Sequence, residues 1–167
     1  MMRLRFQFAL VSVALLAAGL AQDSLVPKAP IVIAMPTEGV TVAPGGSVRV
    51  ELRFRVSPGY HINSNQPHSE FLIPTRLKLN PPASLVPGAV AYPEGKDLSF
   101  TFSPKEKLSV YSGDFSVRAE LRALGSAPAG SYKVPGELRF QACNDRACFP
   151  PTKLPVELEV TVRKPRS

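Results

Sequence analysis

The segment Val48-Arg49-Val50-Glu51-Leu52-Arg53-Phe54-Arg55-Val56 has the clearest two-residue hydrophobic period in the sequence. Apolar side chains occupy every second position, and the positions between them are charged. Because successive side chains of a β-strand point to opposite faces, one face of this segment is apolar and the other is charged. The segment therefore predicts a strand that has one face in a core and the other in water.

Other segments along the chain repeat this pattern, and turn residues separate them every 8 to 12 positions. Residues 60–67 are too polar toward their end for a core strand, and residues 103–106 contain Pro104 and predict a turn. Short alternating strands with such spacing are typical of an antiparallel β-sandwich of the immunoglobulin type. Residues 31–35 and 40–42 form either one first strand or two short ones. The other expected strands are residues 48–56, 75–79, 89–92, 98–102, 108–111, 115–121, 138–142 and 156–162.

Residues 1–21 have the pattern of a secretory signal. Arg3 and Arg5 precede an apolar run, which ends at small residues before Gln22. We expect cleavage there, and retention as a membrane anchor is the alternative. The remaining 146 of the 167 residues suit one soluble domain: an extended leader over 22–30, the domain over 31–163 and a basic tail over 164–167.

The formal net charge of +7 falls to +5 once Arg3 and Arg5 are removed, and the positive residues that remain are scattered along the chain. Scattered charge on an exported protein argues against nucleic acid as a partner. We expect a periplasmic or otherwise exported monomer, in a compartment where disulfides persist.

The only two cysteines, Cys143 and Cys148, are separated by four residues and followed by Phe149 and two prolines. A disulfide over so short a loop removes little chain entropy, which modestly favours chemistry over stabilisation. Arg146 favours a nearby thiolate, whereas Asp145 disfavours it. From the residues alone, an inert disulfide and a redox-active dithiol remain equally good interpretations.

A metal site is a third and weaker interpretation, in which His61 and His68 would join the two cysteines. The spacings between these residues do not match the usual zinc patterns. We expect no metal and no cofactor. His68 lies in a polar loop and is expected to be solvated, whereas His61 could lie beside the cysteines.

Five segments occur in an order that resembles the N-terminal periplasmic domain of DsbD, the thiol:disulfide interchange protein. They are residues 60–65, 71–75, 92–96, 108–111 and 141–151, and the resemblance covers about residues 31 to 162. The cysteine segment with its trailing prolines is fairly specific, and the ordered set is more so. The resemblance implies an immunoglobulin-like sandwich, in agreement with the strand pattern.

The resemblance also implies a function: thiol-disulfide exchange through a Cys143/Cys148 pair that passes electrons to or from thioredoxin-fold partners. By the family pattern Cys148 attacks the partner disulfide and Cys143 resolves the mixed disulfide. The family's partners include disulfide isomerases and cytochrome c maturation proteins. Because this chain ends at Ser167 without a membrane segment or thioredoxin domain, we expect a separate membrane protein as electron donor.

Further residues are expected beside the pair. A loop that shields the cysteines in the family corresponds to residues 94–102, with Leu98 or Phe100 as the covering side chain. His61 and Asn63 stand where well-known members have tyrosines. Glu94 and Asp97 are the approximate counterparts of carboxylates beside the family's pair, and the spacer that contains Arg146 is shorter than in those members.

The alternative function is of another class. In it the chain is a non-catalytic binding or assembly module, and the disulfide between Cys143 and Cys148 is purely structural. The reduction potential of the pair separates the two interpretations.

Overall fold

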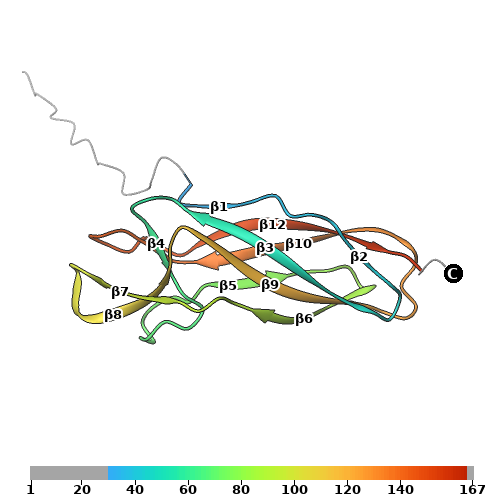
Figure 1. Ribbon diagram of the computed structural model, residues 1–167, viewed down its shortest axis with the longest axis horizontal. Helices are drawn as coiled ribbons and strands as arrows, with labels where there is room; N and C mark the ends of the chain where they lie inside the picture. Colours follow the sequence, from blue (N-terminus) through green and yellow to red (C-terminus); the bar gives the residue numbers. More distant parts are fainter. Residues whose placement is uncertain (1–29, 165–167) are drawn as a thin grey trace, which may run out of the picture.

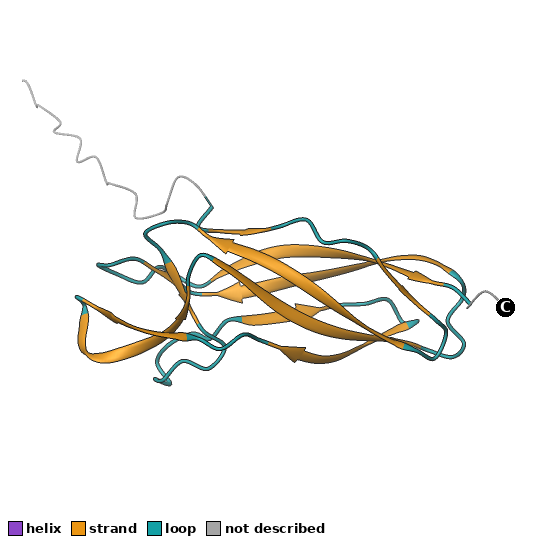
Figure 2. Ribbon diagram, viewed as in Figure 1, coloured by secondary structure: helices purple, strands orange, loops and turns teal. Residues whose placement is uncertain are grey.

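The computed structural model describes residues 30–164, and within that range every regular element is a β-strand (Figure 2). No helix between residues 30 and 164 is long and apolar enough to cross a bilayer. The predicted signal at 1–21, residues 22–29 of the leader and residues 165–167 of the tail lie outside the described residues.

The first large sheet contains the segment with the clearest alternation. Its strand order is β1 (Val32–Ala34), β3 (Ser47–Val56), β9 (Asp114–Ala123) and β6 (Leu85–Ala91), and all its pairs are antiparallel. Strand β3 pairs with β9 over nine residues of each strand, which is the most extensive pairing in this sheet.

The second large sheet has the order β2 (Val40–Val42), β12 (Thr152–Val162), β10 (Gly130–Phe140) and β5 (Arg76–Leu79). Its pairs are antiparallel except β12 with β2, which is parallel. The predicted strands at 31–35 and 40–42 are therefore two separate elements, and each belongs to a different sheet.

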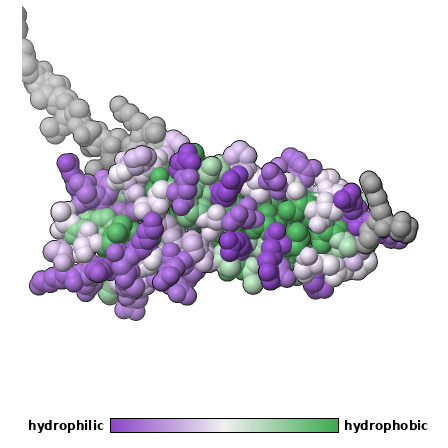
Figure 3. Space-filling view, in the orientation of Figure 1, coloured by the Kyte–Doolittle hydropathy of each residue, from purple (hydrophilic) through white to green (hydrophobic). Residues whose placement is uncertain are grey.

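The two large sheets lie over one another along the length of the molecule (Figure 1). Their facing side chains form the core, because alternation turns the apolar half of each strand inward. On the face drawn in Figure 3, hydrophilic residues stand out along the whole molecule, and hydrophobic residues are visible between them. The predicted all-β, immunoglobulin-like sandwich is confirmed. The core side chains that are 2% exposed or less include Val50, Leu52, Phe54, Val117, Leu121, Val134, Leu138, Leu158 and Val160.

A third, smaller sheet lies at one end of the sandwich, on the left in Figure 1. Its order is β11 (Ala142–Cys143), β4 (His61–Asn63), β8 (Ser103–Tyr111) and β7 (Lys96–Phe100). Strand β10 of the second sheet ends at Phe140, and after a single intervening residue the chain enters β11. Through this connection the large sheet positions the cysteine segment.

The structure corrects two sequence predictions at this end of the molecule. Residues 60–67 were expected to hold no core strand, yet β4 lies there and all three of its residues are buried. Pairing with β11 on one side and β8 on the other encloses the strand and supplies partners for its backbone.

The turn predicted at residues 103–106 is the second correction. The chain instead turns at Thr101 and Phe102, and β8 begins at Ser103 as an inner strand between β4 and β7. Pro104 is tolerated because it lies at the very start of the strand, where one missing N–H disrupts little of the ladder.

Phe54 tests the assignment of the core. It is 0% exposed and stacks on Phe115 with ring centroids 5.3 Å apart. We expect Phe54→Ala to lower the free energy of unfolding by about 3–5 kcal/mol, through lost apolar burial and an unfilled cavity. Urea denaturation at an unchanged m-value measures the loss. Arg49→Ala, at an exposed position of the same strand, is the control and should change stability by less than about 0.5 kcal/mol.

Candidate functional site

The two cysteines form a disulfide at the end of the small sheet. Their sulfur atoms are 2.00 Å apart, and the two residues also form an isolated antiparallel β-bridge. Their surroundings differ sharply. Cys143 is 0% exposed, whereas Cys148 belongs to the exposed residues of the loop that follows. A second protein that approaches this end of the molecule therefore meets Cys148 first.

Asn144 organises the four-residue spacer. Its side-chain Oδ1 accepts hydrogen bonds from the backbone N–H groups of Arg146 and Ala147, both at 2.9 Å. Its own backbone N–H donates to the Ala147 carbonyl at 3.0 Å. Asn is suited to such turns because its short side chain reaches the backbone two and three residues ahead. The spacer is thus a closed turn, which returns the chain to Cys143.

His61 lies directly beside the buried cysteine, since it is opposite Cys143 in the β4–β11 register. The imidazole is 4% exposed and stacks against the ring of Phe100, with centroids 3.9 Å apart. Burial lowers the pKa of His61 from 6.5 to about 4, because the charged form loses its hydration. The imidazole is therefore neutral at neutral pH.

This lowered pKa makes stability depend on pH. Between about pH 6.5 and about pH 4 the unfolded chain binds a proton at His61 that the folded chain does not. The contribution of His61 to the free energy of unfolding is therefore fully retained above pH 6.5. It declines as the pH falls toward 4.

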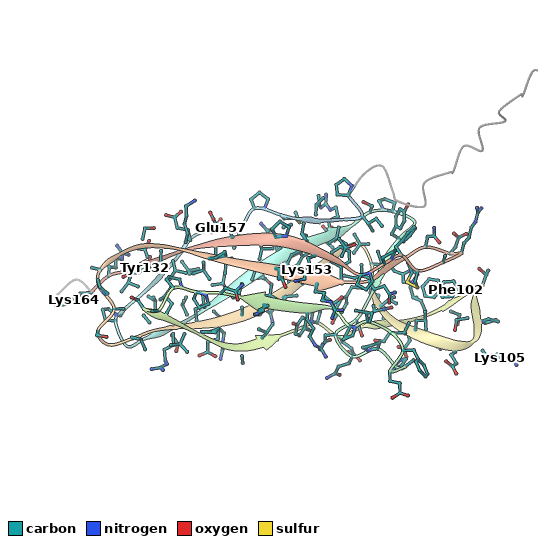
Figure 4. The ribbon with its side chains drawn as sticks, turned by 180° about the vertical axis from the view of Figure 1, so that it is seen from behind. Phe102, Lys105, Tyr132, Lys153, Glu157 and Lys164 are labelled. Atoms are coloured by element: carbon teal, nitrogen blue, oxygen red, sulfur yellow. A yellow bond between two sulfur atoms is a disulfide. The ribbon has the colours of Figure 1, made fainter. Side chains whose placement is uncertain are left out.

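The tip of the β7–β8 hairpin touches the cysteine loop. Thr101 Oγ1 donates a hydrogen bond to the Asp145 carbonyl at 2.6 Å, and Phe102 stacks on Phe100 with centroids 5.5 Å apart. Figure 4 shows Phe102 at the end of the molecule that also holds the yellow disulfide. Sequence reasoning named Phe100 and Leu98 here. It missed the contact through Thr101, because a turn was expected further along the chain.

Asn63 is not opposite a cysteine, but its side chain hydrogen-bonds to two segments near the site. It is fully buried, and its Nδ2 donates to the Ile73 carbonyl at 3.0 Å and to Gln141 Oε1 at 3.2 Å. Gln141 Nε2 in turn donates to the Phe149 carbonyl at 3.2 Å. Gln141, which sequence reasoning quoted only as part of a motif, is thus the residue that joins both sides of the cysteine loop to β4.

Glu94 and Asp97 do not join the cysteine cluster. The register pairs Asp97 with Ser109 and Leu98 with Leu108, so Asp97 and Leu98 face opposite sides of the small sheet. Glu94, Asp97 and Ser109 line a separate open cleft of about 760 Å³. There Asp97 Oδ1 lies 2.7 Å from Nε2 of His68.

The remaining predicted residues divide as follows. Phe100 and His61 lie with the buried cysteine, and Arg146 lies in the spacer with its side chain 87% exposed, 4.0 Å from Asp145. His68 faces the cleft on the other side of the small sheet from His61. The two histidines therefore cannot converge with the cysteines on one metal ion. No metal-binding cluster of three such ligands occurs among the residues that the structure describes.

Residues 32–159 match the family model described as "Thiol:disulfide interchange protein DsbD, N-terminal". The chain belongs to this family. The matched residues include both cysteines. The activity of the DsbD N-terminal family is thiol-disulfide interchange. The family resemblance drawn from the sequence is therefore confirmed. No curated protein matches the sequence.

Solved structures of low sequence identity share the fold. The N-terminal periplasmic domain of ScsB from Proteus mirabilis is 16% identical with a TM-score of 0.51. That match covers 76% of this chain but only 44% of the ScsB chain, so this chain spans less than half of that structure.

Two structures from Neisseria meningitidis are also similar. The reduced DsbD N-terminal domain is 21% identical with a TM-score of 0.42, and the match covers 67% of this chain and 77% of that one. The DsbD N-terminal domain in complex with the PilB N-terminal domain is 20% identical with a TM-score of 0.46, and that match covers 81% of this chain and 88% of the other.

The pKa of His61 tests whether Phe100 shields the imidazole from water. We expect Phe100→Ala to raise the pKa of His61 from about 4 toward 6.5, because water reaches an imidazole that the ring no longer shields. An NMR titration of the imidazole C–H resonances measures the shift. Phe71→Ala, which removes an aromatic ring that is 86% exposed, should leave the titration unchanged. If the pKa of His61 is unchanged in Phe100→Ala, residues other than Phe100 exclude water from the imidazole.

Proposed function

We propose that this chain is an extracytoplasmic thiol-disulfide exchange protein in which Cys143 and Cys148 cycle between disulfide and dithiol. The difference in exposure between the two cysteines carries the proposal. A structural cross-link gains nothing from an exposed half, whereas exchange requires one sulfur that a partner can reach. Membership in the DsbD N-terminal family supports the same activity.

The exposed position of Cys148 supports its role as the sulfur that exchanges with partners. In the reducing direction the Cys148 thiolate attacks a partner disulfide, and one partner sulfur leaves as a thiolate. Cys143 then attacks Cys148 Sγ, so the internal disulfide forms and the second partner sulfur leaves. Two electrons pass to the partner. Burial of Cys143 keeps it from external disulfides and reserves it for this second step.

We further propose thioredoxin-fold proteins as partners and a separate membrane protein as electron donor, with a place in periplasmic disulfide reduction or cytochrome c biogenesis. Family membership supports this assignment. The signal pattern in residues 1–21 supports export. The hairpin tip with Thr101 and Phe102 and the exposed Cys148 loop present one continuous surface to such a partner.

The reduction potential of the Cys143–Cys148 couple distinguishes exchange from a structural role. We expect a potential on the order of −120 to −270 mV, the range of exchange-active pairs. Equilibration in thiol buffers with mass-spectrometric readout measures it. A potential below about −300 mV, together with slow exchange against a thioredoxin-fold protein, would instead identify a binding module with a structural disulfide.

Single cysteine variants test the division of roles. We expect Cys143→Ser to accumulate a mixed disulfide with a thioredoxin-fold disulfide protein, because Cys148 is exposed and nothing resolves the adduct. Cys148→Ser should form little adduct, because the remaining thiol is buried. Non-reducing electrophoresis and mass spectrometry measure the adducts. Equal adduct formation by the two variants would contradict the assignment of Cys148 as the attacking sulfur.

A further inference from the structure

Two buried side-chain polar atoms of β4 have no hydrogen-bond partner: Oδ1 of Asn63, whose Nδ2 donates twice, and Nε2 of His61. Nε2 of His61 makes no hydrogen bond, although the residue is only 4% exposed. Buried polar atoms are nearly always hydrogen-bonded, because an unpaired one has lost its hydrogen bonds to water and gained none in the protein. An apolar side chain would fill this position without the cost. The presence of an imidazole here is therefore not explained by stability, and we look for a chemical role.

The position of His61 relative to Cys143 supplies that explanation. The two residues are directly opposite in antiparallel strands, where Cβ atoms of such pairs are about 4.5–5.5 Å apart and side chains share a face. The Phe100 ring stacks on the imidazole, with 3.9 Å between centroids. The imidazole thus lies against an aromatic ring and next to the strand that bears the inner cysteine.

The chemistry of the inner cysteine creates a need for a proton acceptor. In the mixed disulfide Cys143 must lose its S–H proton before it can attack Cys148 Sγ. Cys143 is 0% exposed, and burial disfavours the thiolate. Removal of the proton by solvent is slow at such a site, and an adjacent basic side chain would speed it.

We propose that His61 exchanges a proton with the Cys143 thiol during resolution of the mixed disulfide. This rests on the proposed exchange function. Nε2 takes the S–H proton, and the Cys143 thiolate attacks Cys148 Sγ. The Cys143–Cys148 bond forms, the bond from Cys148 to the partner breaks, and the electron pair leaves on the partner sulfur. The proton passes from Nε2 to that thiolate, so charge and electrons balance. The reverse reaction uses the same steps.

None of the residues discussed below competes with His61 as the proton acceptor for Cys143. Burial is the only cause that lowers its pKa, and no charged neighbour contributes. From the hairpin the facing residue is Phe100, from β11 it is Cys143, and on β4 itself Asn63 is uncharged. Asp145 and Arg146 have side chains 77% and 87% exposed, and Asp97 pairs with His68 on the opposite face of the small sheet.

The two steps of the exchange can be timed separately with Ellman's reagent, an aromatic disulfide. The fully reduced full-length chain is mixed with an excess of the reagent, and the release of thionitrobenzoate is followed by stopped-flow absorbance. The first equivalent reports attack by Cys148, and the second reports resolution by Cys143. The Cys143→Ser variant, which should release only the first equivalent, assigns the phases.

We expect His61→Phe, which preserves a ring against Phe100, to slow the second phase on the order of 100-fold at neutral pH. The first phase should stay within about twofold. The second-phase rate of the wild type should be flat with pH down to the region of about pH 4, where His61 becomes protonated. In the variant the rate should rise about tenfold per pH unit, because hydroxide must then remove the proton.

Controls separate the possible outcomes. His68→Gln changes the other histidine, on the opposite face, and should leave both phases unchanged. If His61→Phe does not fold, His61→Gln gives the same comparison with a polar side chain that does not titrate. A second phase with wild-type rate and pH profile in the folded variant overturns the role of His61, while a fast first phase leaves the exchange function standing. Absence of a fast first phase in the wild type overturns the exchange function itself.

Discussion

Gln141 is the residue on which the arrangement of this site depends. It lies between the long strand β10 and the two-residue strand β11, where the chain leaves the second large sheet for the small one. Its side chain bonds to the Phe149 carbonyl, to Asn63 and to the backbone N–H of Ile73, and its own carbonyl accepts from the Asn63 N–H. One amide thus ties both ends of the cysteine loop to β4. With the loop held there, Cys143 has to lie beside His61.

The difference between the two cysteines follows from that connection. Cys143 ends a strand inside a small sheet, so the neighbouring strand and the hairpin above it exclude water. Cys148 follows a turn closed by Asn144 and returns to the sheet from the solvent side. A loop of four residues is sufficient, because the Asn144 side chain replaces backbone partners that a longer loop would find elsewhere. The short spacer is therefore compatible with one buried and one accessible sulfur.

In the β7–β8 hairpin, successive side chains point to opposite faces, which separates the predicted site residues into two groups. Phe100 and Leu98 were expected near the cysteines together with Asp97 and Glu94. Alternation places Phe100 against His61, whereas Asp97 turns to the cleft that contains His68. Carboxylates on the far face cannot accept a proton from Cys143. In this chain an imidazole is the titratable group beside the inner cysteine.

The amino-acid sequence by itself determined the fold class, since a two-residue period over β3, β9 and β12 dictates which side chains are buried. It also determined the importance of the cysteine pair, the sole pair in the chain. Only the tertiary structure decided which cysteine is buried, that His61 rather than Asp97 lies beside it, and that Thr101 touches the loop. These facts depend on register and on contacts between segments about 40 to 80 residues apart. Local periodicity carries no information about such pairings, because any strand with the right alternation could have been the neighbour.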